Sequence, residues 1–377
     1  MMYRNPALIE TKGIMFRKFI VIIALILSVG CSSYGIEQAK QEDIESITNA
    51  RAKVLDAEFN SLINKHRINT LGVAVIKNNK LVWQNYYGWQ SEGIPASEST
   101  LFNVASLTKP VVAEAVLRLV AQGKLALDES VATYWVDPDL MQDDRVQLLT
   151  PRMLLNHTSG FMNWRYFSEQ RKLSFINPPG SSFGYSGEGF EYLAKYAENK
   201  LRVPFEQLVQ TQVFDAFEMK HSFLVVDSEN YKKIAKPFDQ NGTFYGYYCS
   251  PYGYCQKEGS YSAAANLVTT VSDYATFFIA SMAGKGLTPK LKADRDTMQG
   301  IQFSRAEISC DDTRDITCPT ELGYGLGWAI THFDDTKLIG HRGTNWKVVS
   351  LAYYYPRSGD GLILFFNAPN KAGLAGM

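Results

Sequence analysis

A serine and a lysine three positions apart stand at the start of an apolar segment. Ser106 and Lys109 are followed by Pro110, which suits the first turn of a helix because its missing N–H is not needed there. Apolar residues then recur at helical spacing. Residues three apart share one face of a helix. The spacing therefore predicts that the serine hydroxyl and the lysine amine lie within hydrogen-bond reach, beside the positive end of the helix dipole.

This pair could perform nucleophilic catalysis. A serine hydroxyl is a weak nucleophile until a base takes its proton, and a lysine can act as that base when burial or a neighbouring cation lowers its pKa. The bare pattern Ser-x-x-Lys is a weak signal, because about one or two chance matches are expected in a chain of this size. Taken alone, a helix start with an exposed lysine is the simpler interpretation.

Two later segments contain side chains that would complete such a site. Tyr185 stands in a turn-rich loop before an expected helix, and a tyrosine beside a lysine ammonium can become a general base. Gly343 lies beside an expected strand, where the backbone can approach a ligand and the N–H of Thr344 can point at an oxyanion. His341 could add a hydrogen bond or a positive charge. Alone, Tyr185 is more often a packed aromatic residue and His341 an ordinary polar one.

Strands are expected near both ends of the chain. A hairpin is predicted over residues 71–76 and 81–87, with a tight turn at Asn78-Asn79, after an amphipathic helix over residues 43–64. Four later strands are expected, and they cover residues 324–330, 336–340, 347–355 and 361–366. This pattern implies an α+β fold: one antiparallel sheet formed from both chain ends, flanked by helices, with an inserted, mainly helical region.

The inserted region contains several helix signals. Thr150 would cap a short helix that Gly160 stops, and a second helix is expected over residues 188–201. A further helix is expected over residues 271–283, with its start placed at Ser272 or Asp273. The domain of residues 43–377 is divided into an α/β part, at about 43–106 and 262–377, and a mainly helical part, at about 107–261.

The charge balance of the chain indicates which partners to expect, and its first residues indicate where the protein is located. The chain has 38 basic and 38 acidic residues and no long basic run, so nothing indicates nucleic-acid binding. A basic start, a short apolar run and Gly30 before Cys31 predict an export signal over residues 1–30. This segment resembles a bacterial lipoprotein signal, which implies a lipid on Cys31 and a tether over residues 31–42. The protein would then lie on the periplasmic side of a bacterial membrane, the outer membrane if the cell has one.

Export also bears on the remaining cysteines, because disulfides persist outside the cytoplasm. Cys249 and Cys255 bracket a turn rich in Gly, Tyr and Pro, and Cys310 and Cys318 bracket an acidic loop. Two local disulfides are expected. A metal site is the alternative, but neither pair has the Cys-x-x-Cys spacing and no histidine is close in sequence, so no metal is expected.

The order of the three candidate segments resembles that of a known family. The chain is similar to the serine β-lactamase and penicillin-binding-protein superfamily, in its class C and DD-peptidase-like branch, from about residue 45 to the end. The matching motifs are Ser106-x-x-Lys109, Tyr185-Ser-Gly187 and His341-x-Gly343, with residues 154–160, 179–186 and 324–328 as supporting stretches. His157, inside the first supporting stretch, is interpreted as structural.

The resemblance implies a role for each matching residue. Ser106 would attack the acyl carbon and form an acyl-enzyme, while Lys109 and Tyr185 would share the proton transfers. The N–H groups of Ser106 and Thr344 would form the oxyanion hole, where losing one donor typically costs about 3 to 4 kcal/mol. The resemblance implies neither a metal nor an organic cofactor.

Two departures from the family pattern bear on the substrate. Gly187 stands where many members carry an asparagine that holds the substrate's amide. His341 replaces a permanently charged lysine, which weakens the binding of a substrate carboxylate near neutral pH. We therefore expect a hydrolase of small acyl, peptide or ester substrates. Peptidase or DD-carboxypeptidase-like activity ranks first, esterase second and class C-type β-lactamase third.

A non-catalytic cell-wall or drug-binding protein is the alternative from another class. The joint presence of Ser106, Lys109 and Tyr185 argues against it, because binding alone needs no proton transfer. The sequence makes no prediction of the oligomeric state.

Overall fold

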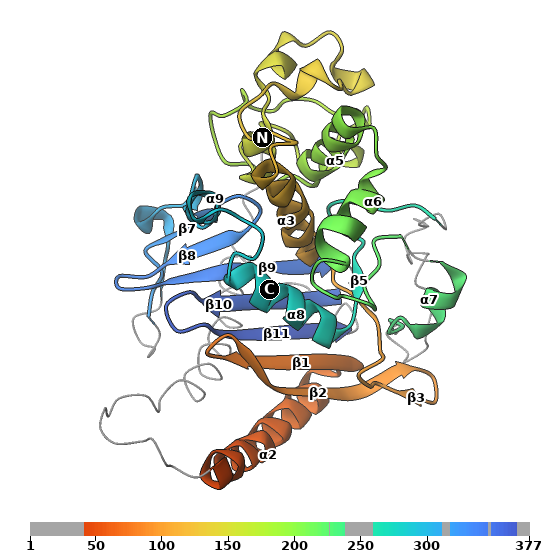
Figure 1. Cartoon of the computed structure of the whole chain (residues 1–377), viewed down its shortest axis with the longest axis vertical. Helices are drawn as coiled ribbons and strands as arrows, with labels where there is room; N and C mark the ends of the chain where they lie inside the picture. Colours follow the sequence, from red (N-terminus) through yellow and green to blue (C-terminus); the bar gives the residue numbers. More distant parts are fainter. Residues whose placement is uncertain (1–40, 226, 238–258, 311–316, 346–347, 368–377) are drawn as a thin grey trace.

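The computed structural model describes residues 41–225, 227–237, 259–310, 317–345 and 348–367 (Figure 1). The expected export signal, Cys31, and the cysteine pair Cys249 and Cys255 lie outside these residues. Across the described ranges, every helix is too short or too polar to cross a membrane.

The centre of the fold is a nine-stranded antiparallel sheet in the order β3-β2-β1-β11-β10-β9-β8-β7-β6. Strand β1 pairs with β11, so both ends of the domain contribute neighbouring strands, as the sequence predicted (Figure 1). The strands of this sheet are β1 (Thr70–Lys77), β2 (Lys80–Ser91), β3 (Ile94–Pro95), β6 (Gly300–Phe303), β7 (Glu321–Tyr324), β8 (Ala329–His332), β9 (Lys337–Asn345), β10 (Val348–Tyr355) and β11 (Asp360–Asn367). A small second sheet pairs β4 (Phe102–Asn103) with β5 (Val268–Thr269).

The predicted hairpin is formed by β1 and β2. Its turn residues Asn78 and Asn79 have φ values of 50° and 60°. Positive φ at both central residues matches the right-handed twist of the flanking strands, and asparagine tolerates it better than most residues. The local sequence therefore determines this turn.

The sheet separates two hydrophobic clusters. On β1, Leu71 and Val73 pack in the cluster that α2 (Gln41–His66) covers through Phe59. The intervening Ala74 and Ile76 face the larger cluster, which α8 (Val271–Met282) and α3 (Thr108–Ala121) cover from the other side. Both faces of the central strands are thus buried, which explains their continuous apolar sequence.

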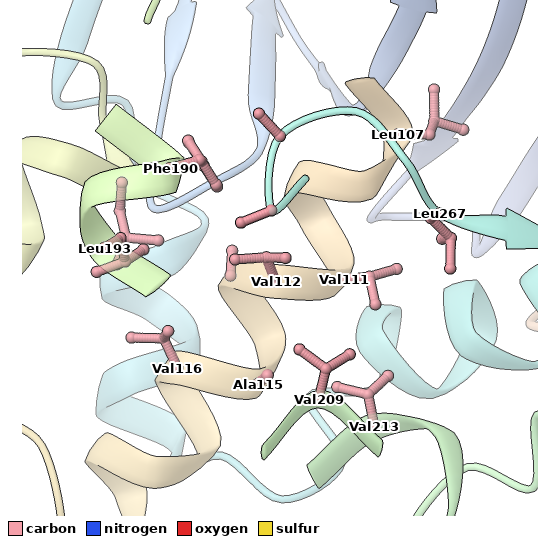
Figure 2. Close-up of a cluster of buried hydrophobic side chains, with 14 of the residues drawn as sticks. Leu107, Val111, Val112, Ala115, Val116, Phe190, Leu193, Val209, Val213 and Leu267 are labelled. Atoms are coloured by element: carbon pink, nitrogen blue, oxygen red, sulfur yellow. The ribbon is translucent and has the colours of Figure 1, made fainter. Parts of the chain in front are cut away.

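Helix α3 runs through the middle of the helical region (Figure 2). It is preceded by a single 3-10 turn, η1 (Ala105–Leu107), and its side chains are buried from Thr108 to Leu117. Figure 2 shows Val111, Val112, Ala115 and Val116 packed among Phe190, Leu193, Val209, Val213 and Leu267. The other helices are α4 (Pro151–Leu155), α5 (Gly187–Leu201), α6 (Phe205–Val209), α7 (Ser228–Lys233) and α9 (Pro289–Arg295).

The prediction of one continuous strand over residues 324–330 is wrong. Strand β7 ends at Tyr324, and β8 begins at Ala329. Gly327 has a φ of 82°, and a Cβ on it would lie 2.1 Å from the Cβ of Ala113 in α3. Its N–H also donates to the carbonyl oxygen of Leu155 (3.0 Å). The chain turns here because it packs directly against α3.

Two expected helix ends also differ. Thr150 caps α4 as predicted, but the helix ends at Leu155, well before Gly160, and His157 has a left-handed φ of 61°. Helix α8 begins at Val271 because Thr270 is its N-cap: Thr270 Oγ1 accepts the N–H of Asp273 (3.1 Å).

Candidate active site

Ser106 lies in η1, directly before α3. It is partly exposed, whereas every other residue from position 101 to 117, all described, is buried. The preceding Ala105 has a φ of 46°, a conformation rare for residues with a side chain and concentrated at functional sites. Ala105 N–H donates to Asn103 Oδ1 (3.0 Å), and Thr108 Oγ1 donates to the Ala105 carbonyl oxygen (2.6 Å). A rigid, buried frame therefore presents the hydroxyl.

The amine of Lys109 is buried and faces this hydroxyl. It donates to Ser106 Oγ (3.2 Å) and to the carbonyl oxygen of Ala264 (2.9 Å). The ring centroids of Tyr185 and Phe190 lie 4.8 and 5.6 Å from its Nζ. Two oxygen acceptors and two aromatic faces thus surround the amine in place of bulk water.

Tyr185 stands directly before α5. Ser186 is the N-cap, and its Oγ accepts the N–H of Gly189 (3.0 Å). His157 packs on Tyr185 with ring centroids 4.4 Å apart, and its Nδ1 accepts the N–H of Ser186 (3.2 Å). The structure thus brings Tyr185 to Lys109, and His157 supports the backbone that carries the tyrosine.

Gly343 and Thr344 lie near the end of β9. Strand β8 pairs with β9 only as far as Gly340, and beyond that point η1 packs against β9. A Cβ on Gly343 would lie 2.2 Å from the Val104 carbonyl oxygen and 2.8 Å from the backbone nitrogen of Ser106. Thr344, the next residue, has an exposed side chain. The two segments that the sequence assigns to the oxyanion hole therefore lie side by side.

His341 is buried beneath the site, and its exposed fraction is only 1%. Burial, with a smaller contribution from the charge of Lys109, lowers its pKa to about 3. Its Nδ1 lies 2.7 Å from the carbonyl oxygen of Arg342, so the proton of the neutral ring resides on Nδ1. Its Nε2 has no hydrogen-bond partner among the described residues. Of the two roles open to His341, burial disfavours the positive charge, because it lowers the pKa of the ring.

The space beside Gly187 is occupied by Trp164. A Cβ on Gly187 would lie 2.4 to 2.8 Å from three atoms of the indole ring. The N–H of Gly187 donates to Oδ1 of Asn163 (2.9 Å). The asparagine of the family pattern is therefore absent, and the position where its side chain would begin is filled by an aromatic ring.

These groups together suit acyl transfer. A hydroxyl has an amine within hydrogen-bond distance, a phenol ring lies over that amine, and Gly343 of the adjoining strand lies beside the backbone nitrogen of Ser106. In the described part of the chain, no three His, Cys, Asp or Glu side chains gather as a metal site requires.

Comparison with known proteins decides the family. A family model described as Beta-lactamase matches residues 51–376. The chain belongs to the beta-lactamase family. This match confirms the family resemblance inferred from the sequence.

The curated relatives are named for two different activities. Esterase EstB of Burkholderia gladioli is 40% identical over 115 residues, which cover 29% of this chain and 29% of that protein. A beta-lactamase of Pseudomonas fluorescens is 28% identical over 203 residues, which cover 50% of this chain and 55% of that protein. The matches thus span well under two thirds of either curated relative.

A solved structure of a class C beta-lactamase resembles the whole fold. Its TM-score is 0.66 at 19% identity, and the match covers 87% of this chain and 97% of that chain. At this identity the likeness concerns the fold alone.

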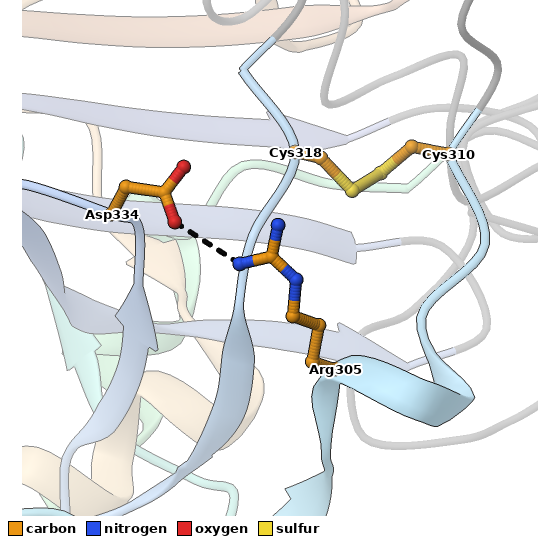
Figure 3. The surroundings of a disulfide bond; sticks show 4 residues. All are labelled: Arg305, Cys310, Cys318 and Asp334. Atoms are coloured by element: carbon orange, nitrogen blue, oxygen red, sulfur yellow. Dashed lines mark hydrogen bonds and ion pairs between the residues drawn. A yellow bond between two sulfur atoms is a disulfide. The ribbon is translucent and has the colours of Figure 1, made fainter.

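In this beta-lactamase-family chain, Cys310 and Cys318 form a disulfide (Figure 3). The bridge lies between β6 and β7, near the exposed ion pair of Arg305 and Asp334 (3.1 Å). It is distant in sequence from every candidate catalytic segment except β9. The bridge closes the connection between β6 and β7 at one edge of the sheet, and it confirms one of the two disulfides that the sequence predicted.

Sequence reasoning missed three residues of the site: Trp164, Ala264 and Glu191. Trp164 and Ala264 act through contacts with residues far away in sequence, and no local pattern marks them. Glu191 is half-buried and shares its helix face with the charged residues Glu188, Lys195 and Glu198, so no local pattern marks it either.

Proposed function

We propose that the protein is an esterase that hydrolyses small carboxylic esters through an acyl-enzyme on Ser106. The observation that carries this proposal is the indole ring of Trp164 over Gly187. An amide substrate needs a polar partner for its N–H and C=O groups, and leaving such groups unpaired in a site costs about 1 to 3 kcal/mol each. An ester has no N–H to satisfy, so an aromatic wall suits it better.

Neutral His341 supports the same choice. Peptides cleaved at their C-terminus and β-lactams present a carboxylate, which a cation would bind. The pKa of His341, about 3, removes that cation at neutral pH. Both features weigh against the peptidase activity that the sequence ranked first, and 40% identity to an esterase over 115 residues adds to the case.

The proposed reaction proceeds in two steps. Ser106 Oγ attacks the ester carbon while its proton passes to the Lys109–Tyr185 pair, and the N–H groups of Ser106 and Thr344 stabilise the oxyanion. The C–O bond to the alcohol breaks, and the pair returns the proton to the leaving alkoxide. Water then attacks the acyl-enzyme as the same pair takes its proton. The bond between the acyl carbon and Ser106 Oγ then breaks, the acid leaves, and the pair returns the proton to Ser106 Oγ. The exported, lipid-anchored location stays a prediction of the sequence.

The test compares three substrates on the purified full chain. We expect kcat/KM for p-nitrophenyl acetate to exceed the values for a D-Ala-D-Ala peptide and for nitrocefin by about 100-fold or more. Ser106→Ala should lower ester hydrolysis by at least about 1000-fold, as loss of a nucleophile does. Ser181→Ala, in an exposed loop, is the matched control and should match the wild type. Faster peptide cleavage, or ester hydrolysis that survives in Ser106→Ala, would refute the proposal.

The role of Trp164 is tested by making room beside Gly187. The double variant Trp164→Ala with Gly187→Asn should raise the ratio of amide to ester hydrolysis by about tenfold, because the new side chain can pair with an amide. Gly187→Asn alone should be poorly active, since its Cβ meets the indole at 2.4 Å. An unchanged ratio in the folded double variant would show that Trp164 does not select esters.

A further inference from the structure

Glu191 lies behind the site, on the same helix that begins after Tyr185. Its Oε1 accepts the hydroxyl hydrogen of Ser262, and its Oε2 accepts the N–H of Ala263 (3.2 Å). Ser262 Oγ in turn accepts the N–H of Ala264 (3.2 Å). The carboxylate therefore holds three consecutive residues, 262–264, by direct and relayed hydrogen bonds.

The same three residues hold the candidate base. The carbonyl oxygen of Ala264 accepts a hydrogen bond from Lys109 Nζ (2.9 Å), and Lys109 also donates to Ser106 Oγ (3.2 Å). Ala263 and Ala264 are both fully buried, so their backbone has little room to move. In Figure 2 the segment that leads to Leu267 crosses over the start of α3. Hydrogen bonds on either side of the Ala264 backbone thus link Glu191 to the nucleophile.

Charge links Glu191 and Lys109 as well. Burial raises the pKa of Glu191, and the hydrogen bonds from Ser262 and Ala263 together with the positive charge of Lys109 oppose that rise. Glu188, one turn earlier on α5, adds a small effect in the raising direction. Glu191 and Lys109 therefore lie close enough for their charges to interact across residues 262–264.

The remaining charges around Glu191 have their own partners. Glu191 borders a cavity of about 450 Å³ whose lining includes Asp137, Arg165 and Lys195. Arg165 pairs with Asp137 and Glu188 (2.8 Å each), and Lys195 pairs with Glu198 (2.7 Å). The lining cations are thus engaged by other carboxylates, while Glu191 binds the segment that holds Lys109.

We propose that Glu191 is a positioning residue: it holds residues 262–264 so that the Ala264 carbonyl keeps the Lys109 amine against Ser106, and its negative charge acts on that amine. The inference rests on the proposed function only in taking Lys109 as a base for Ser106. It does not depend on whether the substrate is an ester.

The test measures how fast a fluorophosphonate labels Ser106 across a range of pH, in the full chain. The rate should rise with pH as the base loses its proton. In Glu191→Gln the plateau should fall about tenfold, because one acceptor for residues 262–264 is lost. The rising limb should also move to lower pH, because the negative charge that acts on the amine is gone.

Controls separate positioning from a merely structural role. Glu191→Asp keeps the negative charge but has a shorter side chain. Its plateau labelling rate should therefore fall, while the rising limb of its pH profile stays at the wild-type pH. Glu198→Gln, an ion-paired glutamate of the same helix, should match the wild type in both respects. A limb that stays in place in Glu191→Gln, whether or not the plateau falls, overturns the inference.

A second variant covers the case in which Glu191→Gln fails to fold. Ser262→Ala retains the carboxylate and removes its hydroxyl donor, and the labelling rate should fall about fivefold. A wild-type rate in Ser262→Ala would overturn the inference. Labelling of Ser106 in a protein that hydrolyses no ester would refute the proposed function and leave this test intact.

Discussion

His157 and His341 are buried histidines that flank Tyr185 in opposite tautomers. Nδ1 of His157 accepts the N–H of Ser186, whereas Nδ1 of His341 donates to the carbonyl oxygen of Arg342. Burial lowers the pKa of both rings, and the positive charge of Lys109 lowers it further. Keeping both rings neutral avoids a second and third cation beside the candidate base, where they would oppose its protonated form and repel one another.

The neutral state of His341 predicts an acid-sensitive stability. In the unfolded chain the ring takes up a proton near its ordinary pKa of 6.5, whereas the folded ring stays neutral down to about 3. As pH falls through this window, protons therefore bind the unfolded state first, and the free energy of unfolding decreases. The contribution of one such group is at most about 1.4 kcal/mol per pH unit.

His341→Leu should flatten this dependence in urea unfolding measured between pH 4 and 7. Ile339→Val, a neighbouring buried position in β9, is the packing control: it should lower stability by about 1 kcal/mol at every pH and leave the slope as in the wild type. Equal slopes for His341→Leu and the wild type would contradict the neutral assignment.

At the scale of elements, the contact between β9 and η1 assembles the site. Ser350 of β10 donates from Oγ to the Val104 carbonyl oxygen (2.6 Å), and its register partner in β9 is Gly343. Gly343 therefore lies between the strand pair and the turn that carries Ser106. The strand can approach that turn only because position 343 has no side chain.

Gly343→Ala should disrupt this contact. Its Cβ would lie 2.2 Å from the Val104 carbonyl oxygen and 2.8 Å from Ser106 N, so either β9 or η1 must shift. We expect kcat/KM for p-nitrophenyl acetate to fall by about 100-fold or more, the effect of a lost oxyanion donor. Gly189→Ala is the control, because its Cβ would meet its neighbours at 3.6 to 3.7 Å, an ordinary contact distance. Wild-type activity in folded Gly343→Ala would refute this account.

At the scale of the whole molecule, a buried ion pair joins the helical part to the sheet part. Arg295, at the end of α9, donates from Nη1 to Glu114 of α3 (2.6 Å) and to the Ser281 carbonyl oxygen of α8 (2.9 Å). Trp328, just before β8, donates from Nε1 to the same Glu114 oxygen (3.1 Å). Both charged side chains are fully buried. The pair therefore fixes the position of α3, and with it that of Lys109, relative to the sheet.

Breaking this pair should be costly. Arg295→Met leaves Glu114 buried without its cation and should lower the free energy of unfolding by about 3 to 5 kcal/mol. The double variant Arg295→Met with Glu114→Gln should recover most of that loss, because no charge is then left unpaired. Chemical denaturation measures both variants.

The matched control for Arg295→Met is Arg305→Met. Arg305 pairs with Asp334 on the surface, where both side chains are about three-quarters exposed (75% and 73%). Its loss should cost less than about 1 kcal/mol, as exposed ion pairs contribute little. Equal losses for Arg295→Met and Arg305→Met would show that the buried pair is not a structural link.

The sequence by itself determined the local features. Ser106 and Lys109 are close because residues three apart meet on a helical face, and the Asn78-Asn79 turn follows from residues that tolerate positive φ. The antiparallel sheet of both chain ends followed from where the strand patterns fall. In each case the cause lies within a few neighbouring residues or in a repeated pattern.

Only the tertiary structure decided the features that depend on contacts between distant segments. The split between β7 and β8 arises where Gly327 meets Ala113, and the environment of Gly187 depends on Trp164. Glu191 accepts hydrogen bonds from Ser262 and Ala263, and the carbonyl oxygen of Ala264 accepts one from Lys109. Each of these contacts joins positions more than 70 residues apart. Such contacts depend on how elements pack in three dimensions, and side-chain spacing along the chain carries no information about that packing.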